Sequence, residues 1–441
     1  MPTNSGSVFL LGAGASVDAG IPASTKLAEH LIKLAAGHQQ SEGATDAVRY
    51  VYSALMHEQS RTAVERGRMS ALSEAMETDA GSDSVDVEKL LRAVDLLARR
   101  RELEIRPFIA SWDATLQLLD ASPHNHERGL RVWRAICNGL SKEIPASLRD
   151  AVGRSSRTPI RNSRGDVAAL VAATFTSLRG TSAEHRDFTS SLTDAIQEQL
   201  KPGDGGAFVA ARHLLERLLC RTVWLSDASK VGYLDPLLRQ ASVGRPLVVA
   251  TLNYDNCVEL SASNLGLRLS TRVKNKNPQT ALDSDTDDAD VILLKLHGSA
   301  NWKSGKMHVG EHQALPQQFA IEVQDEIVGD SRHRPLLIFG QESKLTAERP
   351  FFDLFLEFRD RLRNARMLTV IGYSWRDDHI NAVIRSWLAR DYAEKLRIID
   401  PKWTSTNAPF ARELKREIKT RISGNLVEVI EKTAADAIEH L

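Results

Sequence analysis

Residues 8–22 read VFLLGAGASVDAGIP, and this stretch decides the fold. Four large apolar residues lead into a turn of small residues, with Gly12 and Gly14 two positions apart. The pattern predicts a short buried strand that enters a glycine turn and leaves into a helix over residues 25–35. Backbone N–H groups and a helix N-terminus meet at such a turn. They favour negative charge there, above all a phosphate.

The turn is compatible with nucleotide binding, but it does not match the dinucleotide fingerprint. Gly12 and Gly14 carry no Cβ atom, so the backbone can approach a pyrophosphate closely. The hydroxyl of Ser16 is placed to cap the turn or to reach a phosphate oxygen. The third glycine of GxGxxG would fall at Val17. A purely structural glycine turn therefore stays open as the alternative.

The composition of the 441-residue chain is that of a globular protein with room for two or three domains. Lys plus Arg and Asp plus Glu each number 57, so the overall charge gives no argument for nucleic-acid binding. The three cysteines lie far apart and form no CxxC pair, which argues against a zinc ribbon and a disulfide framework. We see no signal peptide and no apolar stretch long enough to span a membrane, and we expect a soluble, cytoplasmic protein.

Residues 241–441 alternate runs rich in Val, Ile and Leu with helical stretches. We expect helices over 351–364 and 378–390, and strands in RPLVVATLN, DVILLKLHGS, RPLLIFG, ARMLTVIGYS, KLRIIDP and NLVEVIE. Continuous apolar runs are typical of parallel strands buried on both faces. The pattern predicts a Rossmann-like, doubly wound, mainly parallel α/β sheet. Residues 1–35 and 241–441 would form this domain, and residues 36–240 a large all-helical insertion.

Side chains capable of chemistry follow several of these strands, at the edge where open α/β sheets bind ligands. Asn253 and Asp255 follow one strand, and His297 follows the next. Gly372 and Asp400 take the same place after two later strands. An imidazole accepts a proton near neutral pH, a glycine admits a ribose or phosphate, and a carboxylate binds ribose hydroxyls. Each residue also has an ordinary structural interpretation, because Asn and Asp cap helices and a lone histidine is often only hydrogen-bonded.

The motifs GAGAS with GIP, TLNYD, KLHG and IGYSWRDDHIN, in this order, resemble the SIR2-like (sirtuin-type) NAD-binding family. More narrowly, they are similar to bacterial SIR2-like proteins of anti-phage defence, which hydrolyse NAD. The motifs lie in residues 8–22 and about 246–400. In the middle of the chain only VDVEKLL, at residues 85–91, is similar to an acidic helix of these proteins.

The resemblance implies a role for each matching residue. The turn that contains Ala13 and Ser16 between its glycines would bind the phosphates of NAD. Asn253 would orient the nicotinamide ribose and a water molecule, and Asp255 would meet the nicotinamide carboxamide. His297 would act as the general base. NAD is then the substrate, cleaved to nicotinamide and ADP-ribose.

Two departures from sirtuin deacylases bear on the reaction. Ala23-Ser24-Thr25 follow GIP in place of an acidic-aromatic-arginine stretch, and three cysteines cannot form the four-cysteine zinc module. We therefore expect no zinc, and an NAD-dependent protein deacylase is the less favoured alternative. The other alternative is a sensor or scaffold that binds NAD or ADP-ribose without turnover. The presence of both Asn253 and His297 argues against such an inactive site.

An NAD hydrolase has to be silent in a healthy cell. We therefore expect a homo-oligomer, or a partner protein that acts as the trigger, and the helical insertion is the natural place for either contact. The resemblance implies a HerA-type ATPase or a short Argonaute as possible partners. Nucleic acid is expected to be contacted only through such a partner, and a membrane not at all.

Overall fold

The structure is a computed structural model that describes eleven ranges of the chain: residues 6–37, 43–56, 85–100, 206–241, 246–273, 288–307, 317–330, 333–339, 350–390, 393–420 and 426–441. The chain divides into two compact units. One unit comprises Met1–Gly37, Val51–Ala93 and His213–Leu441, and the other His38–Tyr50 and Val94–Arg212. The first unit thus takes in 51–93 and 213–240 as well as the two terminal segments predicted to form the sheet.

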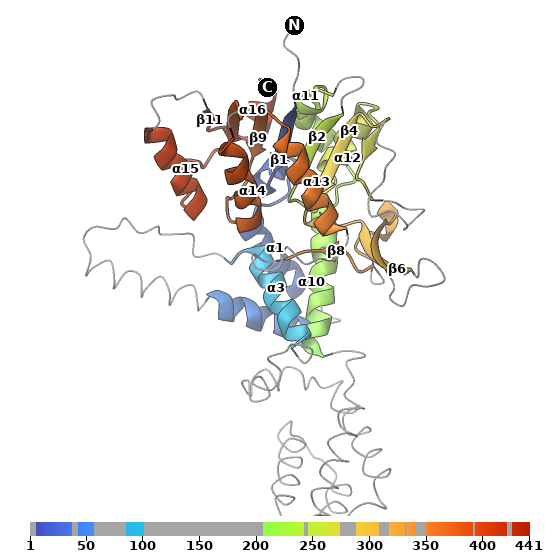
Figure 1. Ribbon diagram of the computed structural model, residues 1–441. Helices are drawn as coiled ribbons and strands as arrows, with labels where there is room; N and C mark the ends of the chain where they lie inside the picture. The colour runs from blue at the N-terminus through green and yellow to red at the C-terminus, as the bar shows by residue number, and fades with distance from the viewer. Residues whose placement is uncertain are drawn as a thin grey trace, which may run out of the picture. The chain divides into compact units, whose positions relative to one another are not determined.

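A seven-stranded parallel sheet forms the centre of the first unit (Figure 1). Its order is β11-β10-β9-β1-β2-β4-β3. The strands are β1 Ser7–Leu11, β2 Leu247–Thr251, β3 Leu269–Ser270, β4 Val291–Lys295, β9 Met367–Ile371, β10 Lys395–Ile399 and β11 Val427–Ile430. The flanking helices and this sheet confirm the predicted Rossmann-like α/β fold, whereas the all-helical character of the insertion stays a prediction.

The helices follow the apolar periodicity of the sequence. Those described are α1 Ser24–Ala36, α3 Val87–Ala98, α10 Ala207–Val223, α11 Asp235–Leu238, α12 Cys257–Asn264, α13 Phe351–Arg363, α14 Asp378–Leu388, α15 Pro409–Thr420 and α16 Ala434–Ile438. Short 3-10 helices are η1 Ala13–Ser16, η3 Ala228–Leu234 and η4 Asp325–Ile327. Residues 43–56 are also helical.

One continuous hydrophobic core joins α13, α14 and α15 to a face of the sheet (Figure 1). In α14 the buried residues Ile380, Val383, Ile384 and Trp387 recur every three or four positions, which places them on one side of the helix. They pack with alternate residues of the strands, such as Leu10, because successive side chains of a strand point to opposite faces.

Two small antiparallel sheets lie outside the main sheet. In one, β5 (Gly298–Ser299) pairs with β8 (Leu336–Leu337); in the other, β6 (Trp302–Met307) pairs with β7 (Gln317–Glu322). The prediction that RPLLIFG adds a strand to the parallel sheet is wrong. Its two paired residues are only half-buried, and they bind the loop that follows β4.

The strand order places a topological switch point next to β1. From β1 the chain proceeds to β2 on one side, and after β4 it crosses to β9 on the other side of β1. The switch point therefore lies between β1 and β9, at the carboxyl edge of the sheet. Open α/β folds bind ligands in the crevice at such a point.

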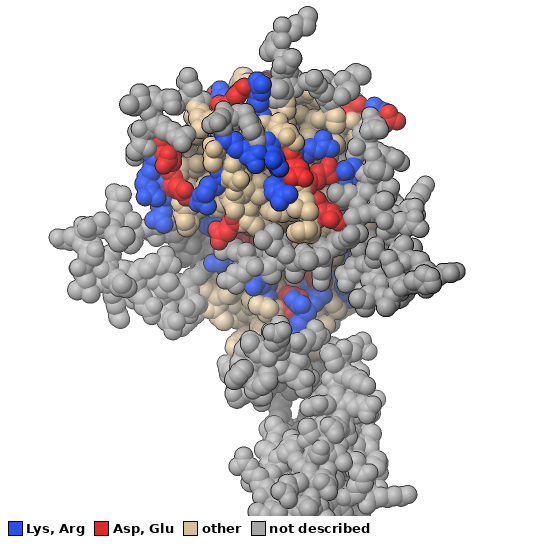
Figure 2. Space-filling model, viewed as in Figure 1, with Lys and Arg blue, Asp and Glu red and all other residues tan. Residues whose placement is uncertain are grey.

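Charges of both signs cover the face of the molecule shown in Figure 2. Among the exposed ion pairs, Arg385 of α14 binds Glu413 of α15 at 2.5 Å, and Arg366 binds Glu394 at 2.8 Å. The mixture agrees with the balanced composition. Among the described residues, no helix combines the length and the apolar character that crossing a bilayer requires.

Candidate functional site

Five neighbouring strands end at the same level at the carboxyl edge of the sheet. Their last paired residues stand opposite one another across the sheet, in the order Ile399, Ile371, Leu11, Thr251 and Lys295. A predicted site residue follows each by one or two positions: Asp400, Gly372, Gly12, Asn253 and His297. Because neighbouring strands lie about 4.8 Å apart, the sheet arranges these five residues in one row.

The glycines of the row allow two loops to touch. A Cβ atom on Gly12 would lie 2.6 Å from the carbonyl oxygen of Gly372, and one on Gly372 would lie 2.4 Å from the nitrogen of Ala15. The amide of Gly14 donates to the carbonyl of Gly372 at 2.9 Å, and Gly372 has a φ of +61°. The glycines thus serve a loop-to-loop contact that the sequence analysis did not foresee. Phosphate binding by the turn stays a prediction.

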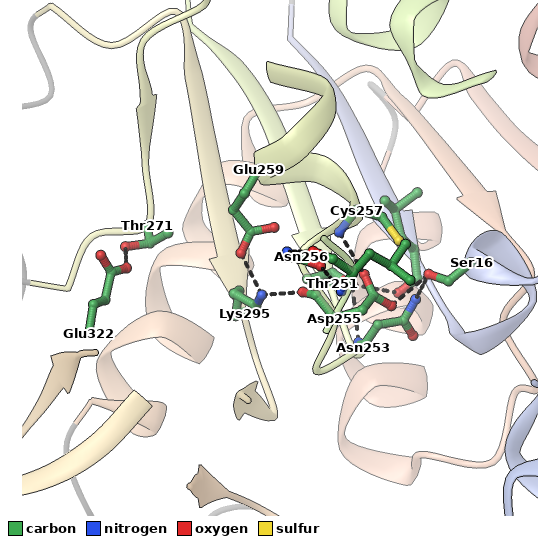
Figure 3. A network of polar contacts seen from close by, with 12 residues as sticks. Ser16, Thr251, Asn253, Asp255, Asn256, Cys257, Glu259, Thr271, Lys295 and Glu322 are labelled. Atoms are coloured by element: carbon green, nitrogen blue, oxygen red, sulfur yellow. Dashed lines mark hydrogen bonds and ion pairs between the residues drawn. The ribbon is translucent and has the colours of Figure 1, made fainter. Parts of the chain in front are cut away.

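Three predicted site residues form one hydrogen-bonded network (Figure 3). The side-chain amide of Asn253 donates to the carbonyl of Gly12 and to the hydroxyl of Ser16, both at 2.9 Å. The Ser16 hydroxyl donates in turn to Oδ2 of Asp255 at 2.7 Å. All three side chains are buried. The network ties the glycine turn after β1 to the loop after β2.

Asp255 also has the capping role that the ordinary interpretation assigned to it. Its Oδ1 accepts the backbone N–H of Cys257 at 3.1 Å, at the start of α12. Burial, and next the charge of Asp255, raise the pKa of the Cys257 thiol far above its usual range. Cys257 is therefore a neutral thiol beside this carboxylate.

Lys295 supports the same loop from β4. Its side chain is fully buried, and Nζ donates to the backbone carbonyl of Asp255 and to Oε1 of Glu259 at 2.6 Å (Figure 3). Burial raises the pKa of Glu259, and the charge of Lys295 opposes that shift. A lysine in an apolar strand is costly unless its charge is paired. Here the pair holds the backbone of Asp255 in place.

His297 lies at the end of β4 in a different environment. Its imidazole is buried, and Nδ1 lies 3.9 Å from Oε1 of Glu88 on α3. The ring of His379, in the first turn of α14, lies 5.8 Å from it between centroids. The backbone carbonyl of His297 accepts the N–H of Ile338 at 3.0 Å. Elements from three distant parts of the sequence thus surround this imidazole.

Acidic charge gathers around two buried tyrosines near this histidine. Burial raises the pKa of Tyr254 well above its usual range, and the charges of Glu88 and Asp377 raise it further. The pKa of Tyr373 is raised in the same way by burial, by Asp377 and by Glu88. Tyr254 follows β2 and Tyr373 follows β9. Negative charge thus acts on two loops of the carboxyl edge, those that follow β2 and β9.

The ligand-binding role of Asp400 stays a prediction, and the structure gives its carboxylate partners in its own turn. The carboxylate of Asp400 accepts the N–H of Lys402 at 2.8 Å and the hydroxyl of Thr406 at 3.4 Å, within its own turn. Burial raises the pKa of Asp400. Asp377 occupies the N-cap position of α14, but its side chain makes no capping hydrogen bond.

Sequence reasoning missed Glu88 and Lys295 as parts of the site. Lys295 was visible as the one charge in the apolar run VILLKL, which is a signal for a buried pair. Glu88 stands in VDVEKLL, far from every strand, and nothing in the local sequence places it beside His297. Among the described residues, no group of three or more His, Cys, Asp or Glu side chains is arranged to hold a metal ion.

Comparisons with known proteins give a similar solved structure and a matching family model. A solved structure described as "Structure of Sir2Tm bound to a propionylated peptide" is similar to this chain at 13% identity, over 53% of this chain and 78% of that chain, with a TM-score of 0.29. No curated protein matches the chain. The family model described as SIR2-like domain matches residues 247–419. This segment, from β2 into α15, thus carries the sequence of a SIR2-like domain.

Proposed function

We propose that this chain hydrolyses NAD to nicotinamide and ADP-ribose. One observation carries the proposal: Asn253 and His297 each lie two residues beyond Thr251 and Lys295, which are register partners on neighbouring parallel strands. The ends of two neighbouring strands thus carry an amide and an imidazole, at the edge where the fold binds ligands. The SIR2-like match of the surrounding segment supports NAD as the substrate.

The chemistry fits these groups. Water forms a bond to C1′ of the nicotinamide ribose, while the C1′–N bond breaks and its electron pair leaves with nicotinamide. His297 accepts the proton that the water loses, which is the task of a general base. The ribose develops positive charge in the transition state. Negative groups already in place at this edge, such as Asp377, stabilise that charge.

Hydrogen bonds hold the side-chain amide of Asn253 in one orientation. Its amide N–H groups are engaged by Gly12 and Ser16, so the hydrogen bonds orient the side chain. The carbonyl oxygen of the amide is the group that remains for a water or a ribose hydroxyl. Asp255 contacts the nicotinamide carboxamide by sharing or exchanging its bond to Ser16.

The biological role that we propose is that of an effector in a bacterial anti-phage system, which depletes NAD in the cytoplasm during infection. Such an activity needs a trigger. We propose self-association or a partner, of the HerA-type ATPase or short Argonaute kind, acting through the helical insertion.

The test is to incubate the purified protein with NAD and to measure free nicotinamide, alone and with any neighbouring gene product. His297→Ala is the matched control, and loss of a general base lowers the rate about 10²- to 10⁴-fold. Equal cleavage by the control would remove His297 from the mechanism. NAD bound but recovered intact would favour a sensor, and O-acyl-ADP-ribose formed from an acyl-lysine peptide would favour a deacylase.

A further inference from the structure

We infer that Glu88 is the positioning residue of His297: its carboxylate orients the imidazole and strengthens it as a base. The inference rests on the proposed function and gives a role to a residue for which the motifs of the chain state none. Glu88 comes from α3, which is separated from β4 by about half of the chain. Only the tertiary structure brings the two side chains together.

The contact is specific to one ring nitrogen. Oε1 of Glu88 lies 3.9 Å from Nδ1 of His297, which is an ion-pair separation rather than a hydrogen bond. A carboxylate on this side favours a proton on Nδ1, because it attracts the N–H dipole. Nε2 then keeps its lone pair, and a general base needs that lone pair.

The protein holds Glu88 in place through its neighbours. Asp86 accepts the N–H of Glu88 at 2.8 Å and thereby caps the first turn of α3. The other oxygen of Asp86 lies 3.4 Å from Arg376, in the loop between β9 and α14. Leu90 and Leu91 anchor the helix because both are buried. The position of Glu88 near a helix N-terminus also favours its ionised form.

Titratable side chains approach the imidazole from the elements packed around it. Glu88 approaches from α3 and His379 from α14. Asp377, from the loop after β9, acts with Glu88 on Tyr254 and Tyr373. A carboxylate within about 4–6 Å raises the pKa of a histidine, whereas burial and a second cationic imidazole lower it. Without the Glu88 carboxylate, the influences that lower the pKa of a histidine remain, and the one that raises it is lost.

The decisive experiment compares wild type with Glu88→Gln, which keeps the shape and removes the charge. We expect kcat for NAD cleavage to fall about 10- to 100-fold, the usual effect of removing a group that orients a catalytic histidine. KM should change much less. The acid limb of the kcat profile should move down by about one pH unit, because the base becomes weaker.

Two further variants separate positioning from a merely structural role. Glu88→Asp keeps the charge and should keep the acid limb near its wild-type place. Glu29→Gln removes an exposed carboxylate from α1 and should leave rate and profile unchanged. A Glu88→Gln enzyme whose kcat or acid limb equals that of wild type would overturn the inference.

A second readout keeps the inference independent of activity. The ring resonances of His297, assigned by their loss in His297→Asn, are titrated by NMR in wild type and in Glu88→Gln. We expect the midpoint to fall in Glu88→Gln, and equal midpoints would refute the role of Glu88. If wild type never cleaves NAD but the midpoint falls, the proposed function fails and the pairing of the two residues stands.

Discussion

Asp255 and Asp400 are both carboxylates that follow a strand of the same sheet, but the centre and the flank of the sheet use them differently. At the centre, Asp255 reaches across to Ser16, 239 residues away in sequence. At the flank, Asp400 binds only two and six residues ahead, within its own turn. The two carboxylates therefore have different partners, although each follows a strand of the sheet.

The difference lies in what stands beside each strand end. β1 and β2 stand in the middle of the sheet, between β9 and β4, and the loops that follow these four strands contact one another, so that a polar side chain finds partners from distant parts of the chain. β10 is one strand from the edge, and its neighbour β11 ends in the half-exposed Ile430. The centre is built from long-range contacts, the flank from local ones. Substitutions at the centre should therefore cost more.

The largest effect is expected at Lys295. In Lys295→Ala, Glu259 and the carbonyl of Asp255 lose their buried cation, and we expect the free energy of unfolding to fall by about 3 to 5 kcal/mol. Chemical denaturation measures it. Lys295→Met with Glu259→Gln, which removes both charges, should lose less. A fall below about 1 kcal/mol in Lys295→Ala would break the contrast between centre and flank.

The next effect is expected where the two loops touch. Gly372→Ala adds the strain of a positive φ to a clash with the backbone of Gly14 and Ala15, together about 2 to 5 kcal/mol. Gly20→Ala is the matched control, since its φ is also positive but nothing lies within 4 Å of the added atom. Thermal unfolding of both variants separates clash from strain. Equal losses of stability in the two variants would show that the backbone at the loop contact shifts at little cost to accept the added methyl group.

A matched pair of carboxylates compares the centre and the flank directly. Asp255→Asn disturbs the bonds to Ser16 and Cys257, and we expect a loss of about 1 to 3 kcal/mol of stability together with most NAD cleavage. Asp400→Asn should lose at most about 1 kcal/mol and keep the wild-type KM for NAD. A large rise of KM in Asp400→Asn would return this residue to the ligand-binding role predicted from sequence.

The smallest effect is expected on the surface of the flank. Side-chain bonds from Lys395 and Arg397 lower the pKa of Glu428. Such a carboxylate adds stability above its ordinary pKa of about 4.3, and the stability is lost as the pH falls through the lowered value. Glu428→Gln should cost about 0.5 to 1 kcal/mol at pH 7, since the pair is partly exposed, and nothing in strong acid. The free energy of unfolding of wild type and of Glu428→Gln, measured from pH 7 to pH 2, checks this expectation.

The sequence by itself determined the fold and the row of strand ends. Continuous apolar runs predict parallel strands buried on both faces, and each strand end brings the residues after it to the carboxyl edge. This predicted five strands of the main sheet after the helical region, and placed Gly12, Asn253 and His297 in one row. The same logic failed for RPLLIFG, because two leucines after a proline make an equally good short pair outside the sheet.

Only the tertiary structure decided which side chains meet. Local sequence does not state that Glu88 faces His297, that Lys295 holds the carbonyl of Asp255, or that Gly12 packs on Gly372. Each of these contacts joins loops or helices that leave different strands. Their partners are set by strand order and by the crossing from β4 to β9, whereas hydrophobic periodicity records only which face of an element is buried.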